Sequence, residues 1–185
     1  MISAELDMSP SADFDEMQNA LDHLAKFQAI ASKHGVHDVF QDNGGRIIQI
    51  ILALNLKVLP GRTGNDAVDC EMNQYELKSI CVPGCGGFST SHHLNLKTIE
   101  KLKGVSWIFA FFKGNTMFQI YKVSPNKMEK VYSKWINDLR FKDHLNNPKV
   151  SIEFVKTNGV QVWFLNEKYR DTQLTFFDIC PHLED

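Results

Sequence analysis

The sequence lacks the features that mark membrane, secreted or disulfide-rich proteins. No apolar run among its 185 residues approaches the roughly 20 residues that cross a bilayer, and the N-terminal segment has no signal-peptide core. Only 4 cysteines are present, and their spacing gives no disulfide framework. We therefore expect a reduced, cytoplasmic protein with a single main domain, because this length and an ordinary globular composition suffice for one core.

A strongly basic balance is also lacking, since the net charge is only −2. This value by itself argues against a nucleic-acid partner. The charges are unevenly distributed, however: residues 1–96 hold 6 Lys/Arg and 12 Asp/Glu, residues 97–156 hold 12 and 5, and residues 157–185 hold 2 and 5. A basic segment after an acidic one suits a protein that meets phosphates on one side, although solvated helix faces would give the same pattern.

The stretch 65–79 carries the most informative chemistry in the chain. Residues 74–78 within it have the pattern of a strand. Side chains two apart on a strand share a face, so Glu76 and Lys78 are expected side by side, with Leu77 pointing into the core.

A short polar connection, residues 69–73, predicts a hairpin that returns Asp66 to the neighbourhood of Glu76. Two carboxylates and the Lys78 ammonium would suit metal-assisted phosphodiester hydrolysis. Hard oxygen ligands hold Mg²⁺, the metal activates a bound water, and the lysine orients that water or steadies developing charge. For a bare D…ExK pattern, an exposed and salt-bridged face of two strands is the commoner alternative.

A helix is expected over residues 11–34, with Gly35 at its C-terminal cap. The series of apolar positions breaks at Gln28, although Phe27 beside it could carry the stripe on. Two interpretations stay open: the helix packs on its own core, or its stripe meets that of a second subunit across a two-fold axis. The apolar positions before the break, at alternating spacings of three and four, are Phe14, Met17, Leu21 and Leu24.

The remaining elements predict an α+β fold, with helices early and a mostly antiparallel sheet in the middle and at the end. The last 20 residues contain an apolar cluster that could pack back on the domain. The expected elements are a buried helix (46–55), a loop (81–87), a short basic helix (95–104), a strand hairpin (105–112 with 117–123), a helix (125–140) and a last hairpin (150–155 with 160–165).

Two cysteines and two histidines lie within thirteen residues, at Cys81, Cys85, His92 and His93. Their C-x₃-C-x₆-H-H spacing matches no common structural zinc site. Adjacent histidines in a Gly/Ser-rich setting are better explained as polar contacts on a surface loop, so we do not expect zinc here.

Six short motifs, taken in order, are far more specific than D…ExK alone. They are DVFQDNGG (38–45), LPGRxGNDAVD (59–69), YELKSI (75–80), GFSTxHH (87–93), WIFA (107–110) and NNPK (146–149). With these motifs, the chain from about residue 21 to 165 closely resembles the PvuII family of type II restriction endonucleases, in the PD-(D/E)xK nuclease superfamily.

This resemblance implies a restriction-endonuclease-like fold, with a central mixed or antiparallel sheet flanked by helices. It implies one endonuclease domain over residues 1–165, with dimerisation through residues 1–35, and leaves 166–185 as an extension of unknown role. The activity implied is Mg²⁺-dependent hydrolysis of double-stranded DNA by a homodimer, at a palindrome that the matching recognition residues favour as CAGCTG, leaving blunt ends. A cognate DNA methyltransferase would be its functional partner.

The resemblance also assigns roles to single residues. Asp66, Glu76 and the backbone carbonyl of Leu77 match metal ligands, and Lys78 matches the lysine beside the attacking water. Asp66, Glu76 and Lys78 would together be the catalytic residues. The positions that match DNA contacts are Asp42 at the minor groove, Ser89, His92 and His93 at the major groove, and Asn146 and Asn147 at adenine.

Some positions depart from the family pattern. Ser91 replaces the first of three histidines, Leu102 replaces a tyrosine near the active site, and the link before Asn146 is shorter. Two alternatives from other classes remain: a DNA-binding module of nuclease ancestry that no longer cuts, and a repair or junction-resolving nuclease. Retention of the two carboxylates and the lysine of the D…ExK pattern argues against the first.

Overall fold

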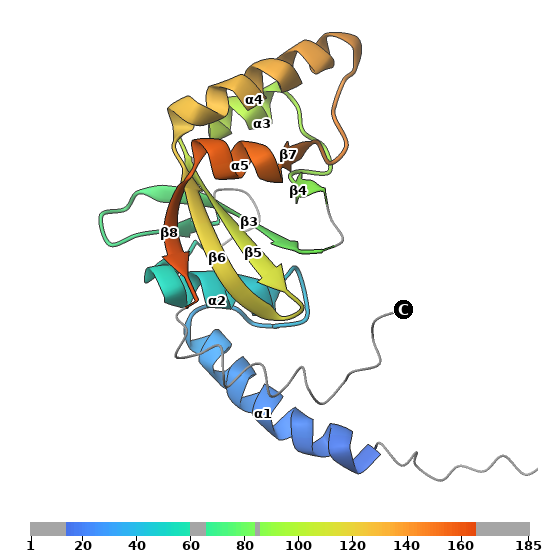
Figure 1. Cartoon of the computed structure of the whole chain (residues 1–185), viewed down its shortest axis with the longest axis vertical. Coiled ribbons are helices and arrows are strands. Elements are labelled where there is room, and N and C mark those ends of the chain that lie inside the picture. The colour runs from blue at the N-terminus through green and yellow to red at the C-terminus, as the bar shows by residue number, and fades with distance from the viewer. Residues whose placement is uncertain (1–13, 60–65, 84–85, 166–185) are drawn as a thin grey trace, which may run out of the picture.

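The computed structural model describes residues 14–59, 66–83 and 86–165 (Figure 1). The first residues of the helix expected over 11–34, residues 60–65, Cys85 and the extension 166–185 lie outside the described residues. Within the described part of the chain, no helix is both long and apolar enough to cross a membrane.

A six-stranded mixed sheet forms the centre of the fold, in the order β1-β2-β3-β5-β6-β8. The neighbours β3 and β5 run parallel, and every other pair in this sheet is antiparallel. A second sheet contains β4 (Gly87–Ser89) and β7 (Lys149–Ser151). The strands of the main sheet are β1 (Lys57–Val58), β2 (Ala67–Val68), β3 (Gln74–Cys81), β5 (Ser106–Lys113), β6 (Thr116–Val123) and β8 (Val160–Phe164).

Helices flank this sheet, which confirms the α+β, restriction-endonuclease-like fold (Figure 1). Helix α2 contributes to the apolar core on one face, and α3, α4 and α5 contribute to the core on the other. The helical elements are α1 (Phe14–Lys33), α2 (Gly44–Leu54), α3 (Leu96–Leu102), α4 (Pro125–Asp138), the 3₁₀ turn η1 (Leu139–Phe141) and α5 (Ile152–Asn158).

Strand β5 is buried from Trp107 to Phe112, as its continuous apolar sequence predicts for a strand covered on both faces. Trp107 packs in the core beneath α3 and α4, and its indole Nε1 donates to the Tyr132 hydroxyl at 2.8 Å. That hydroxyl donates in turn to the carbonyl of Leu102 at 2.9 Å. Leu102 is thus a core residue that helps hold α3 against α4.

The last hairpin expected from the sequence is wrong. Residues 152–158 form α5, while β8 pairs with β6 and the short β7 pairs with β4. The Ser151 hydroxyl accepts from the Phe154 amide and caps the helix. Ile152 and Val155, three residues apart, then share the helix face that packs into the core.

Two smaller differences concern element boundaries. Helix α2 begins at Gly44 rather than Arg46, and Cys81 ends β3 rather than opening a loop. A Cβ at Gly44 would lie 2.1 Å from the Asp38 carbonyl oxygen, so the chain requires glycine at this close approach.

Helix α1 divides into two parts with different surroundings. Its C-terminal half packs on the domain through Leu24, Phe27 and the buried Ala31. Gln28, which breaks the apolar series, accepts from the Val39 amide at 2.9 Å and donates to the Val36 and His37 carbonyls. For this half of α1, the interpretation that the helix packs on its own chain's core is therefore right.

The N-terminal half of α1 runs away from the sheet (Figure 1). Met17 and Leu21 are 46% and 42% exposed there. Nothing in the described part of this chain covers them.

Candidate active site

The β2–β3 hairpin brings Asp66 beside the strand that carries Glu76, as predicted. The Asp66 amide donates to the Tyr75 carbonyl at 3.0 Å, and its Oδ2 accepts from the Leu77 amide at 2.8 Å. Leu77 itself points into the core beside α2. The Asp66 carboxylate is thereby fixed across β3, with its other oxygen not engaged by any of these hydrogen bonds.

Glu76 and Lys78 form an ion pair on one face of β3, with Lys78 Nζ 2.6 Å from Glu76 Oε1. Their side chains retain only 14% and 17% exposure, respectively, and Lys78 Nζ lies 5.8 Å from the centre of the Trp107 ring. Burial raises the pKa of the Glu76 carboxyl above its usual range; Lys78 opposes this shift and Asp66 adds to it. A cation bound at this position would reduce the electrostatic repulsion between the Asp66 and Glu76 carboxylates.

The donor set at this point suits a hard divalent cation. Asp66 and Glu76 each keep one carboxylate oxygen outside the hydrogen bonds just described, and the Leu77 carbonyl follows Glu76 directly. Oxygen ligands of this kind are those that Mg²⁺ prefers, usually completed by water and substrate phosphate. No group of three or more His, Cys, Asp or Glu side chains gathers as a metal cluster in the described ranges.

A cleft of about 640 Å³ opens in front of Asp66 and Lys78. It gathers most of the residues singled out from the sequence, although they come from five separate segments. Glu76, His93 and Asn146 do not line the cleft. Glu76 is ion-paired with Lys78, which does line it. The predicted residues that line the cleft are Asp42, Asp66, Leu77, Lys78, Ser89, His92 and Asn147.

The wall of the cleft opposite α2 consists of two segments, 87–94 and 145–151, joined along their backbones. Beyond the β4–β7 pairing, Leu94 and Leu145 exchange two backbone hydrogen bonds, at 3.0 and 2.8 Å. The backbone N–H of Asn147 donates to the Ser91 carbonyl at 3.0 Å. This pairing fixes side chains about 55 residues apart in the sequence next to one another.

Asn147 and His92 are in direct contact, with Asn147 Nδ2 3.2 Å from His92 Nδ1. Because an amide nitrogen can only donate, Nδ1 of a neutral His92 accepts and Nε2 carries the proton. Asn147 has a φ of 46°, in the left-handed region that asparagine tolerates better than most residues. His93 faces another ring, His144, at a centroid distance of 4.9 Å.

Arg46 and His144 were not predicted as site residues from the sequence. Arg46 lines the cleft, and its guanidinium carbon lies 5.3 Å from the centre of the Phe112 ring. Neither position belongs to a recognisable motif. The only sequence feature that could have indicated Arg46 is its position, as a basic residue directly after the DNGG turn at 42–45.

A family model described as restriction endonuclease PvuII matches residues 12–163 of the chain. The chain belongs to this family. It is accordingly a type II site-specific deoxyribonuclease, a hydrolase that binds DNA, and the resemblance drawn from the motifs is confirmed. Restriction endonucleases generally use a divalent metal, which agrees with the hard-oxygen character of the carboxylate site.

Proposed function

We propose that the protein is a homodimeric, Mg²⁺-dependent endonuclease that cuts both strands of the palindrome CAGCTG and leaves blunt ends. It would act in the cytoplasm beside a cognate DNA methyltransferase, as one domain over residues 1–165 with dimerisation through residues 1–35. The observation that carries the proposal is the shared cleft, which is lined by Asp66 and Lys78 together with His92 and Asn147.

In this proposal Asp66, Glu76 and the Leu77 carbonyl hold the metal. Mg²⁺ held there would lower the pKa of a coordinated water and offset phosphate charge. Lys78 Nζ is held 2.6 Å from Glu76 Oε1, on the same strand. Its ammonium would orient the water and stabilise the negative charge that develops on the phosphate.

Recognition would come from the paired segments and from the turn before α2. His92 presents Nε2–H, a donor suited to guanine O6 or N7, because Asn147 occupies Nδ1. Asn147 keeps its amide oxygen and one amide hydrogen for adenine. The remaining proposed contacts are Ser89, His93 and Asn146 in the major groove and Asp42 in the minor groove.

The dimer is supported by the uncovered part of α1. A palindrome has two-fold symmetry, and a protein that reads both halves matches it with two copies. Met17 and Leu21 supply exposed apolar surface for such a contact.

Digestion of a plasmid with one CAGCTG site tests the function. Mg²⁺ should give a single linear product, and sequencing its ends should place a blunt cut inside the site. A shift in gel mobility without cutting would instead favour a binding module. Preferential cutting of four-way junctions over the linear duplex would favour a junction-resolving nuclease.

Asn147→Gly should weaken sequence discrimination without disturbing the turn. Glycine adopts the left-handed backbone at 46° freely, so this variant keeps the turn and removes the side-chain amide together with its hydrogen bond to His92. We expect a loss of about 1–3 kcal/mol of discrimination per half-site. Competition binding of CAGCTG against single-base variants measures the loss, and an unchanged specificity ratio would leave Asn147 as a turn residue alone.

A further inference from the structure

Arg46 occupies the first turn of α2 at the edge of the cleft. It is half-buried and lines the same cleft as Asp66 and Lys78. It also lines a neighbouring hollow of about 480 Å³ that contains Phe40. The side chain therefore lies where the two hollows meet, and it shares the cleft with Asp42, Asp66 and Lys78.

The guanidinium of Arg46 lies over an aromatic ring and has no ion-pair partner among the residues that the structure describes. The ion pairs found in the described ranges join Lys78 to Glu76 and Lys103 to Glu100. Arg46 lies instead over Phe112, a fully buried ring in the rigid centre of β5. An aromatic ring under a guanidinium restrains its orientation while leaving its N–H groups available to an anion.

The backbone of α2 does not offer an alternative anion site. The Gly44 and Gly45 amides donate to the Gln41 and Val39 carbonyls, and the next two amides donate to the Asn43 carbonyl. The first four N–H groups of the helix are thus engaged. An anion at this end of α2 would therefore have to be bound by side chains, and Arg46 supplies the positive charge there.

We propose that Arg46 binds a backbone phosphate of the DNA strand that lies across the metal site. The proposal rests on the proposed function, because it takes DNA as the occupant of the cleft. A planar guanidinium matches two phosphate oxygens, whereas a base edge would demand a defined sequence. Arg46 therefore adds affinity and holds the strand in register without reading it.

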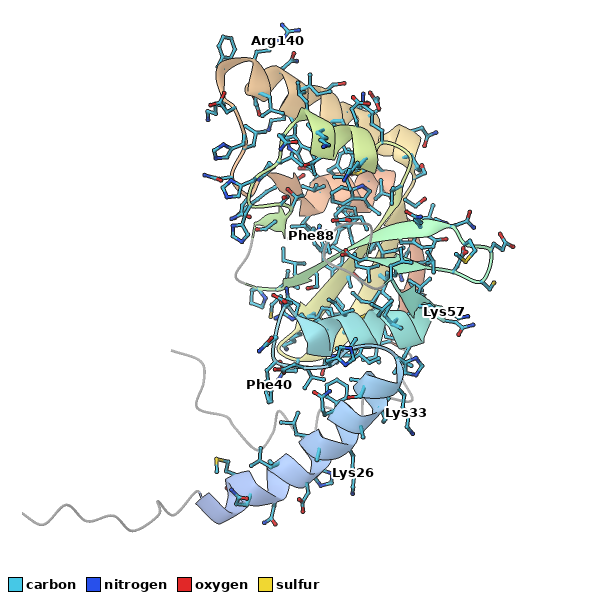
Figure 2. The ribbon with its side chains drawn as sticks, turned by 180° about the vertical axis from the view of Figure 1, so that it is seen from behind. Lys26, Lys33, Phe40, Lys57, Phe88 and Arg140 are labelled. Carbon is cyan, nitrogen blue, oxygen red and sulfur yellow. The ribbon has the colours of Figure 1, made fainter. Side chains whose placement is uncertain are left out.

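The test compares variants in metal-free binding, so that cleavage does not enter the measurement. Arg46→Met keeps an apolar chain over Phe112 but removes the charge, and Arg46→Lys keeps the charge but removes the planar fork. Lys57→Met is the matched control, because Lys57 is exposed on β1 and lies at the opposite end of α2 from Phe40 (Figure 2).

Arg46→Met should lower affinity about 10-fold for CAGCTG and unrelated duplexes alike, with an unchanged specificity ratio. The slope of log affinity against log salt should fall by about 1 for each subunit. Arg46→Lys should lose less affinity and keep most of the slope, and Lys57→Met should match wild type. Thermal unfolding of each variant checks that the fold is intact.

The outcomes separate this proposal from the function itself. Wild-type affinity and salt slope in a folded Arg46→Met protein would overturn the phosphate contact, even if the wild type cuts CAGCTG. Loss of affinity in that variant, with a wild type that binds duplexes but never cuts, would keep the contact and overturn the proposed cleavage. A wild type that binds no duplex would overturn both.

Discussion

Asp66→Asn is expected to abolish DNA cleavage while leaving the fold and DNA binding in place. The asparagine oxygen can still accept from the Leu77 amide, which Asp66 Oδ2 does now at 2.8 Å, so the hairpin keeps its cross-strand bond. The variant loses the negative charge that a hard divalent cation requires. We expect the rate of cleavage to fall by about 10³-fold or more, because metal activation of water and stabilisation of charge are lost together.

DNA binding without metal should hold or strengthen in the same variant. Removing a carboxylate from the cleft reduces repulsion of the phosphate backbone, which dominates affinity for DNA. Lys78→Met should also stop cleavage, but it leaves the buried Glu76 carboxylate without its partner and is expected to cost stability as well. Plasmid cleavage, metal-free binding and thermal unfolding together distinguish these effects.

A wild-type cleavage rate for Asp66→Asn in Mg²⁺ would overturn the assignment of this metal site. Loss of both binding and folding would mean that Asp66 acts mainly through the hairpin. Only retained binding with lost cleavage agrees with the proposed role.

Leu21→Asp is expected to produce monomers and to stop double-strand cutting. Leu21 is 42% exposed on the part of α1 that runs away from the domain, and it belongs to no apolar core cluster of the described residues. A charge buried without a partner in a dimer contact is costly. Sedimentation at micromolar concentration should show the wild type as a dimer and the variant as a monomer.

Ile30→Asp provides the control on the same helix. Ile30 is 44% exposed, almost the same as Leu21, but nine residues away it lies about half a turn around the helix. This variant should remain dimeric and active. A monomeric wild type, or equal dissociation of both variants, would overturn the proposed dimer contact through α1. Leu24 is less suitable for the test because it already packs on the domain.

Local patterns predicted strand β3 and its hairpin with β2 well. The alternation in residues 74–78 fixes which side chains share a face, and the short connection 69–73 limits how far Asp66 can lie from Glu76. The same is true of β5, whose apolar run is of strand length and indicates a strand covered on both faces. These features depend on neighbours in the sequence, so the sequence is sufficient for them.

The segment 152–158 shows where local pattern fails. A short apolar run fits both the period of a strand and that of a helix, and the Asn158-Gly159 pair favoured a hairpin. The Ser151 cap and the burial of Val155 decide for the helix. Packing against the sheet outweighed the turn signal.

The set of chemical groups, the alternation that pairs Glu76 with Lys78 and the family follow from the amino-acid sequence alone. Which distant groups meet depends on the tertiary structure. The contacts of His92 with Asn147 and of Arg46 with Phe112 join residues 55 and 66 positions apart. Such contacts depend on strand pairing and core packing across the whole domain, which local propensity does not encode.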